Sequence, residues 1–255
     1  MFELNGKTIL LTGASKGIGA AIARSLGQAG ANLVAHYGSD AEGAREAAKD
    51  IPPERLKLIG ADFSVPSNVD QLWREALGWR GRIDVLINNA AVMRIKGGIS
   101  DDDATWDGVW DEALRVNVLS PARLMRQAVR HYLGTGGGSI ITISSWAAQR
   151  GPGNPALIAY AASKGAILSA TKTIARNYAK NNILAYMVTP GVVRTRLSVD
   201  AAAAAGGEAA VTAGLAMGEW VPPSDIASLV TFLSSGTCRH LSGATLDVNG
   251  ATYIR

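Results

Sequence analysis

The chain has 255 residues and a formal net charge of +4, with 47% hydrophobic and 18% charged residues. This balance supplies enough apolar surface for a core and excludes a disordered protein. No run of about 18 apolar residues predicts a membrane span, and the scattered basic residues argue against nucleic-acid binding. Cys238 is the single cysteine and no signal peptide is visible, which together predict a cytoplasmic protein. With no motif near it, Cys238 is expected to be a small buried residue.

Short apolar segments alternate with longer helical segments along the chain. Several apolar segments are hydrophobic on both faces, as strands of a parallel sheet covered by helices must be. The pattern therefore predicts an α/β fold, a Rossmann-type doubly wound parallel β-sheet of about seven strands flanked by helices on both faces. The predicted strands are Thr8–Thr12, Asn32–Tyr37, Leu56–Gly60, Val85–Asn88, Ser139–Ile143, Ile183–Val188 and Thr245–Val248.

The helical segments complete this alternation, and residues 1–255 are expected to form a single domain. Pro121 behind Ser120 indicates a helix start, with the serine as N-cap. The predicted helices are Gly17–Ala29, Ala41–Asp50, Val69–Leu77, Trp106–Val118, Pro121–Tyr132, Ile158–Lys180 and Ser224–Leu233.

The segment Gly191–Pro223 departs from the alternation. It contains an alanine run, Ala201–Ala205, which favours helix, and the pair Gly206-Gly207, which permits bending. Ligands of open α/β sheets bind beyond the carboxyl ends of the strands. We therefore expect a mobile substrate lid around residues 191–223, with a variable surface loop as the alternative.

A glycine-rich turn, Thr12–Gly19, follows the first strand and opens the first helix. Its glycines allow the backbone to approach a pyrophosphate, whose charge the helix N-terminus favours. The spacing is Gly-x-x-x-Gly-x-Gly rather than Gly-x-Gly-x-x-Gly. The cofactor candidates in this turn are Gly13, Ser15, Lys16, Gly17, Ile18 and Gly19.

The second strand ends in His36-Tyr37-Gly38-Ser39, without the acid that usually holds the ribose 2′-hydroxyl of NAD. A missing carboxylate removes a repulsion against a 2′-phosphate, which Lys16 and Ser39 could bind. The sequence therefore favours NADP(H), with NAD(H) as the alternative. His36 is expected to be a packed strand residue.

Tyr160 and Lys164 are four residues apart in a predicted helix and so share one face. A nearby ammonium favours phenolate and is expected to lower the pKa of the tyrosine. Such a tyrosine can act as a general acid or base.

Together these motifs resemble the classical short-chain dehydrogenases/reductases from about Lys7 to Gly250. The resemblance implies a catalytic set of Asn117, Ser145, Tyr160 and Lys164. It extends to Asn88-Asn89-Ala90-Ala91, with Ala91 in place of the usual glycine. It implies further cofactor contacts from Tyr37, Asp62, Phe63, Asn89, Ala90, Tyr160, Lys164, Pro190, Gly191, Val193 and Thr195.

The mechanism that the resemblance implies is proton exchange between Tyr160 and a carbonyl oxygen as hydride moves to or from the nicotinamide. Ser145 would stabilise the developing alkoxide, and a proton relay would pass through a water held near Asn117. Ser144 is the adjacent candidate, but neighbouring strand residues face opposite ways, so only one of the two should reach the site. Lys164 would hold the ribose hydroxyls.

The substrate is expected to be a small ketone or alcohol, including sugars. Gly136–Gly138 and Asn181-Asn182 stand where carrier-protein reductases usually have basic residues, which disfavours a 3-oxoacyl-(acyl-carrier-protein) reductase. That enzyme and a non-catalytic dinucleotide-binding regulator remain alternatives. The resemblance further implies a homo-oligomer, often a tetramer, and no metal site is expected. The residues expected in the substrate pocket are Arg94, Trp146, Arg150, Leu157, Met217 and Trp220.

Overall fold

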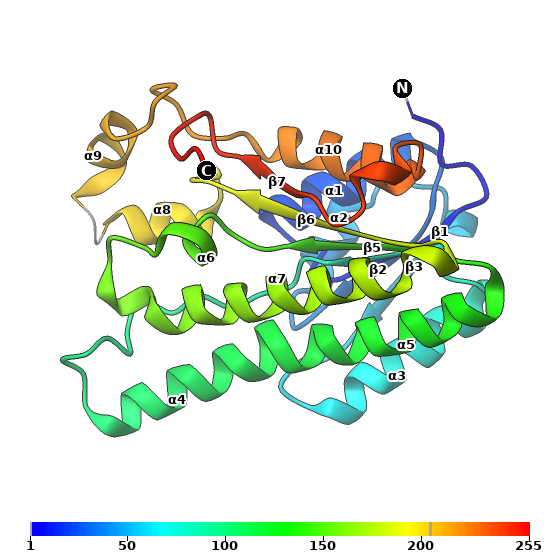
Figure 1. Cartoon of the computed structure of the whole chain (residues 1–255), viewed down its shortest axis with the longest axis horizontal. Helices are drawn as coiled ribbons and strands as arrows, with labels where there is room; N and C mark the ends of the chain where they lie inside the picture. The colour runs from blue at the N-terminus through cyan, green and yellow to red at the C-terminus, as the bar shows by residue number, and fades with distance from the viewer. Residues whose placement is uncertain (1, 204–205) are drawn as a thin grey trace.

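The computed structural model describes residues 2–203 and 206–255. Its centre is a seven-stranded sheet in the order β3-β2-β1-β4-β5-β6-β7, with every pairing parallel. Figure 1 shows the sheet between two layers of helices. The strands are β1 (Thr8–Leu11), β2 (Asn32–Tyr37), β3 (Leu56–Gly60), β4 (Val85–Asn88), β5 (Gly138–Ile143), β6 (Ile183–Pro190) and β7 (Thr245–Val248).

Alternate strand residues enter two separate apolar cores. In β1, Ile9 and Leu11 face one core, whereas Leu10 faces the other. All eight residues of β6 are buried. The sheet is thus covered on both faces, as the continuous apolar segments predict.

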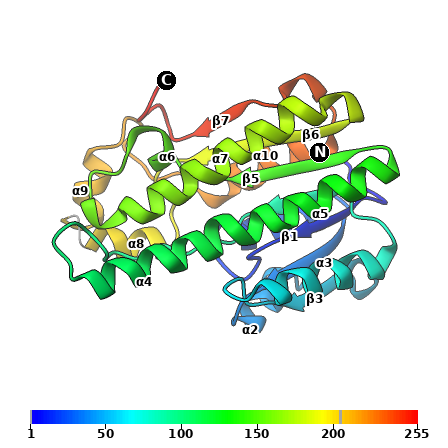
Figure 2. The same ribbon diagram turned by 60° about the horizontal axis from the view of Figure 1, so that its bottom comes forward.

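Each core is closed by its own set of helices. The helices α1 and α10 pack together over one face of the sheet. On the other face, α3, α5 and α7 supply the covering residues; α4, α5 and α7 are prominent in Figure 2. The helices are α1 (Gly17–Gln28), α2 (Ala41–Ala47), α3 (Pro66–Arg80), α4 (Asp103–Leu114), α5 (Ser120–Thr135), α6 (Ala147–Arg150), α7 (Ile158–Tyr178), α8 (Arg196–Ala203), α9 (Gly207–Ala213) and α10 (Pro223–Ser235).

The N-cap role expected for Ser120 is wrong, although α5 does begin at this residue. A π-helical segment, η2 (Arg115–Leu119), joins α4 to α5, so the backbone passes through without a fresh N-terminus. Because the backbone is already helical at Leu119 and Ser120, the Ser120 hydroxyl has no capping role and instead donates to the Phe63 carbonyl at 2.6 Å. π-helical turns of this kind are frequent at functional sites.

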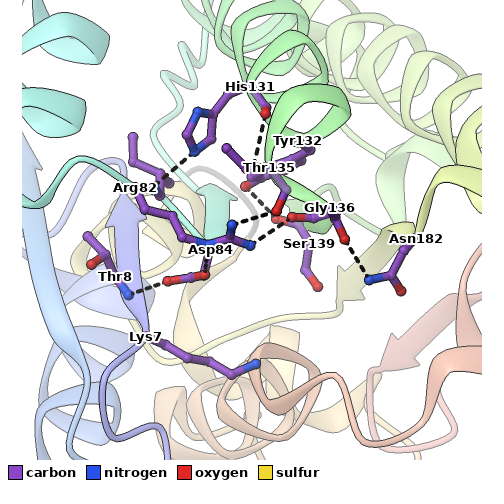
Figure 3. A network of polar contacts seen from close by, with 12 residues as sticks. Lys7, Thr8, Arg82, Asp84, His131, Tyr132, Thr135, Gly136, Ser139 and Asn182 are labelled. Atoms are coloured by element: carbon purple, nitrogen blue, oxygen red, sulfur yellow. Dashed lines mark hydrogen bonds and ion pairs between the residues drawn. The ribbon is translucent and has the colours of Figure 1, made fainter.

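The amino ends of the strands are tied together by a polar network (Figure 3). Asp84 accepts from the Thr8 backbone N–H at 2.8 Å and pairs with Arg82. Arg82 also donates to the carbonyls of Thr135 at 2.7 Å and Gly137 at 3.1 Å. This network joins β1, β4 and the loop before β5 at the amino ends of the strands, opposite the expected ligand site.

The order of the strands reverses at β1, which lies between β2 and β4. Ligands of doubly wound sheets bind in the crevice outside the carboxyl ends at such a switch point. The glycine turn follows β1, and the segment of the predicted lid follows β6. The structure places α8 and α9 in that segment, while Ala204 and Ala205 lie outside the described residues.

Two further observations concern expectations from the sequence. Among the described helices, none has the length and apolar character needed to cross a membrane. Cys238 is exposed, so its expected burial is wrong. It lies just after the glycine that ends α10, in a loop that leaves its side chain in solvent.

Candidate active site

The turn after β1 is built so closely that its glycines cannot carry side chains. Gly13 has a φ of +70°, and a Cβ there would lie 2.9 Å from the Cα of Ala90. A Cβ on Gly19 would lie 1.9 Å from the Gly13 carbonyl oxygen. The first turn of α1 is thus packed against the end of β1, and backbone atoms line the crevice.

Asn89 and Thr12 fasten the glycine turn to the end of β4. The Asn89 side-chain amide donates to the carbonyls of Thr12 and Gly13, both at 2.9 Å. The Thr12 hydroxyl accepts from the backbone N–H groups of Asn89 and Ala90, both at 3.0 Å. Two motifs that are 77 residues apart therefore form one unit.

The segment after β6 also reaches the turn. A Cβ on Gly17 would lie 3.1 Å from the Thr195 side chain, which places Thr195 over the start of α1. Gly191 is packed against Asn249, where a Cβ would lie 2.7 Å from that side chain. Val193 forms a bridge with Val221. The Pro190 carbonyl accepts a hydrogen bond from the Trp146 N–H at 3.0 Å, which brings this segment beside the end of β5.

These features fit a dinucleotide. Among the described residues, no side chain caps α1 at Lys16, and its first turn carries no acid. The N–H groups at the start of this helix are therefore suited to an anion. Ser39 and Lys16 are exposed beside the turn, whereas the Asp40 carboxylate is used to accept from the Gly43 N–H at 2.8 Å. Ser15 is tied to the same segment by its hydroxyl, which donates to the Asp40 carbonyl at 2.7 Å.

The region predicted to hold the adenine lies at the end of β3. Asp62 is exposed and accepts from the Ser64 N–H at 2.8 Å, which lowers the pKa of its carboxyl group. Tyr37 packs on Gly60. Phe63 is buried and stacks on His36 with ring centroids 4.4 Å apart. His36 is a packed strand residue, as the sequence predicts, but it also contacts the glycine turn.

Tyr160 and Lys164 lie one turn apart on α7. The Lys164 ammonium is buried and donates to the Ile143 carbonyl at 2.8 Å, where β5 ends. Its nitrogen is 5.9 Å from the centroid of the Tyr160 ring. The pair therefore faces the sheet end, as the spacing predicts.

The expected fall in the pKa of Tyr160 is not what the structure shows. Burial raises the pKa of this phenol, and a hydrogen bond with Ser145 acts in the opposite direction. Burial also lowers the pKa of Lys164 to about 8. The physical reason is desolvation, which disfavours the charged form of both groups.

The two neighbouring serines have different environments. The Ser144 hydroxyl donates to the Lys164 carbonyl at 2.9 Å and so holds α7 against β5. The Ser145 hydroxyl accepts from the Ala147 N–H at 3.1 Å and is the one beside the Tyr160 phenol. Of the two, Ser145 therefore has the position that the proposed chemistry needs.

Asn117 lies in the π-helical segment and is buried with its amide fully used. Its oxygen accepts from the Val92 N–H at 2.8 Å, and its nitrogen donates to the Val92 carbonyl at 2.9 Å. The nitrogen also donates to the Ser163 hydroxyl at 3.0 Å, and this hydroxyl donates to the Tyr160 carbonyl at 2.7 Å. The sequence analysis missed Ser163, although its place between Tyr160 and Lys164 was a signal.

Three of the residues expected in the substrate pocket, Arg94, Trp146 and Arg150, are engaged in contacts within the protein. Arg94 is engaged by Glu112 through two hydrogen bonds of 2.7 and 2.6 Å. Arg150 lies over the Trp146 ring at 4.6 Å. Trp146 and Arg150 therefore lie together near the end of β5. The positive charge of Arg94 is paired with the carboxylate of Glu112.

The other three pocket candidates differ in exposure. Trp220 is buried, donates to the Thr212 hydroxyl at 2.8 Å and lies beneath Arg194. Met217 is 65% exposed. Leu157 is half-buried at the entrance to α7. Within the described parts of the chain, no group of three His, Cys, Asp or Glu residues is placed to hold a metal ion.

Known proteins resemble this chain in sequence and in fold. A family model described as enoyl-(acyl carrier protein) reductase matches residues 13–251. The 3beta-hydroxysteroid dehydrogenase 1 of Eggerthella lenta is 33% identical over 99% of this chain and 95% of the relative. Dehydrogenase/reductase SDR family member 4 of Homo sapiens is also 33% identical, over 99% of this chain and 89% of the relative.

A solved structure is similar over the whole fold. It is the 3-ketoacyl-(acyl-carrier-protein) reductase from Brucella melitensis complexed with NADH, with a TM-score of 0.87 and 28% identity. The match covers 99% of this chain and 100% of that chain.

Proposed function

The chain belongs to the classical short-chain dehydrogenase/reductase family and is therefore an oxidoreductase, and we propose that it transfers hydride reversibly between a nicotinamide cofactor and a small ketone or alcohol. The observation that carries this proposal is the meeting of Ser145, Tyr160 and Lys164 at the carboxyl end of β5, beside the segment that reaches the glycine turn. Both the acid/base group and the anion-binding turn thus face one crevice.

In this proposal Tyr160 is the catalytic acid and base. It donates its phenolic proton to the substrate oxygen during reduction and takes the proton from the hydroxyl during oxidation. Ser145 donates a hydrogen bond to the same oxygen and stabilises charge that develops in the transition state. The nicotinamide supplies or accepts the hydride. Lys164 contributes positive charge at neutral pH and binds the ribose hydroxyls.

Asn117 has a supporting role in the proposal. Its side-chain amide joins Val92 to Ser163, so it fixes the segment after β4 relative to the helix that carries Tyr160. This places the floor of the crevice and the acid/base group in one rigid unit. A proton relay through a water near Asn117 is part of the same proposal.

The cofactor is proposed to be NADP(H) in preference to NAD(H). The end of β2 offers Ser39 and no carboxylate, and Lys16 adds a positive charge beside it. The Brucella melitensis relative was solved with NADH, so the two cofactors must be compared directly. A dissociation constant tenfold lower for NADH, equal to about 1.4 kcal/mol, would overturn the preference.

The substrate is proposed to be a small carbonyl compound or alcohol. The relatives are named for steroid and carrier-protein substrates, and the 3-oxoacyl-(acyl-carrier-protein) reductase remains the alternative enzyme. We further propose a homo-oligomer in the cytoplasm, with residues 191–223 acting as a lid over the crevice. A screen of ketones, sugars, alcohols and acyl thioesters with both cofactors separates the two enzyme classes.

The test of catalysis is the substrate-dependent absorbance change of NADPH with wild type, Tyr160→Phe and Tyr178→Phe. Tyr178 ends the same helix and serves as the matched control. We expect Tyr160→Phe to lose about 100-fold or more in kcat, because general acid–base catalysis contributes factors of this size. Equal rates in wild type and Tyr160→Phe would leave a non-catalytic dinucleotide-binding regulator as the better explanation.

A further inference from the structure

The buried side chain of His36, at the end of β2, joins two parts of the crevice. Its Nδ1 is 3.1 Å from the Gly13 backbone nitrogen, and its Nε2 is 2.9 Å from the Ala61 carbonyl oxygen. The backbone carbonyl of His36 also accepts from the Ala14 N–H at 2.8 Å. One residue thus contacts the backbone N–H groups of Gly13 and Ala14 in the glycine turn and the loop after β3.

These contacts fix the state of the ring. The Gly13 N–H can only donate, so Nδ1 must be unprotonated and accept. Nε2 then carries the proton and donates to the Ala61 carbonyl. The neutral ring that this arrangement needs is favoured by burial, since desolvation lowers the pKa of His36 to about 4. Stacking on Phe63 holds the plane of the ring.

Gly13 is therefore held from both sides. Its N–H donates to His36 of β2, and its carbonyl accepts from Asn89 beyond β4. On the far side of the ring, Ala61 is followed directly by Asp62 and Phe63. The imidazole thus spans the distance between the turn suited to phosphate and the loop expected to contact adenine.

We propose that His36 is a positioning residue for the adenosine diphosphate half of the cofactor, which it serves by setting the separation of the Gly13 turn and the Asp62–Phe63 loop before binding. The inference rests on the proposed function, because it concerns the cofactor of that site. Without the ring, Gly13 would have a partly buried N–H with no acceptor among the described residues, and the turn would occupy other conformations. Binding would then have to order the turn, which raises the dissociation constant.

Three substitutions separate the contacts of the ring. His36→Phe keeps the stacking on Phe63 but removes both polar atoms. His36→Asn keeps an acceptor in the direction of Nδ1, and His36→Gln keeps a donor in the direction of Nε2. All are purified as the full chain and compared with wild type for thermal unfolding and for binding.

Binding is measured by fluorescence titration of NADPH and NADH, and then of ADP, 2′,5′-ADP and reduced nicotinamide mononucleotide separately. We expect His36→Phe to raise the dissociation constants of the whole cofactor and of the adenosine fragments by about tenfold, as loss of a buried hydrogen-bond partner does. The constant for the mononucleotide should stay within about twofold of wild type, and His36→Asn should recover part of the loss.

The outcomes distinguish this inference from the function on which it rests. A wild-type protein that binds neither NADPH nor NADH overturns the proposed function. A wild-type protein that binds, with His36→Phe weakening both halves of the cofactor equally or not at all, overturns the role of His36 alone. If His36→Phe does not fold, the Asn and Gln variants decide, since each should weaken the adenosine fragments and spare the mononucleotide.

Discussion

At the scale of single residues, burial sets the protonation states of the site. Tyr160 and Lys164 both lose water on folding, and desolvation favours the neutral form of each. The same effect keeps His36 neutral. The residue types could be identified from the sequence, but the direction of the Tyr160 shift could not, because it depends on how deeply neighbouring elements bury the phenol.

The first prediction concerns the two directions of the reaction. Burial raises the pKa of Tyr160, so the phenol keeps its proton through neutral pH. Ketone reduction needs that proton and should hold its rate through neutral pH, then fall in alkali. Alcohol oxidation needs phenolate and should rise with pH. The measurement is kcat/KM in both directions from about pH 6 to pH 10, and an oxidation rate that falls over this range would contradict the assignment.

The second prediction concerns acid stability. The pKa of His36 is about 4 in the folded protein against 6.5 for the free side chain. Between these values the unfolded state binds a proton that the folded state does not. The contribution is therefore complete above pH 6.5 and is lost as pH falls to about 4, a change of about 3 kcal/mol.

The measurement is the free energy of unfolding in urea at neutral pH and near pH 4.5. His36→Gln cannot titrate, so its unfolding free energy should decline less between the two conditions. Carboxylates titrate in both proteins and cancel in the comparison. Equal declines in wild type and variant would show that the neutral ring is not maintained by the fold.

At the scale of elements, most of the fold could be predicted from the sequence. Four of the seven strands have the predicted bounds, including Asn32–Tyr37 and Val85–Asn88, because apolar segments between helical patterns leave few alternatives. The join between α4 and α5 could not be predicted. A π-helical turn keeps helical hydrogen bonding, while Ser120 and Pro121 carry the local signal of a fresh start.

In the candidate site, too, local features could be predicted from the sequence and contacts between distant elements could not. Glycine spacing and the Tyr160–Lys164 pair are local signals, and their placement agrees with the sequence analysis. The contacts of the His36 ring with Gly13 and with Ala61 join three separate elements, so no local pattern indicates them.

The third prediction compares two glycine-to-alanine substitutions in helices. Gly19→Ala would place a Cβ 1.9 Å from the Gly13 carbonyl oxygen, so the turn must move. We expect cofactor binding to weaken by about tenfold or more, because backbone shifts of this kind cost over 1 kcal/mol. The measurement is the NADPH dissociation constant.

Gly78→Ala is the matched control. Gly78 lies in α3, and among the described residues nothing approaches its Cβ position within 4 Å. The change should leave binding intact and raise the free energy of unfolding by up to about 1 kcal/mol through helix propensity. Similar NADPH affinities for the two variants would mean that close packing of the turn is not needed for binding.

At the scale of the whole molecule, the groups expected to carry the chemistry and the polar network that ties the strands together lie at opposite ends of the strands. The carboxyl ends of the strands carry the glycine turn, Ser145 and the segment with Thr195. The amino ends carry the network around Arg82 and Asp84 (Figure 3). Parallel strands make this separation possible, because every strand presents the same end to the same edge.

The fourth prediction follows from that separation. Arg82→Met keeps the aliphatic stem but removes the ion pair with Asp84 and the bonds to the carbonyls of Thr135 and Gly137. We expect the free energy of unfolding to fall by about 2 kcal/mol, since several partly buried groups lose their partner together. The kcat/KM value should change less than about twofold, because the substitution lies at the far edge of the sheet.

Arg130→Met serves as the control, because Arg130 is exposed on α5 and the substitution makes the same change of side chain. Surface substitutions of this kind usually stay within about 0.5 kcal/mol. Urea denaturation of both variants, with kcat/KM measured on the same preparations, separates the two edges. If Arg82→Met lowered kcat/KM in proportion to the free energy of unfolding, the two ends of the strands would be energetically coupled. The network around Arg82 would then help to position Tyr160.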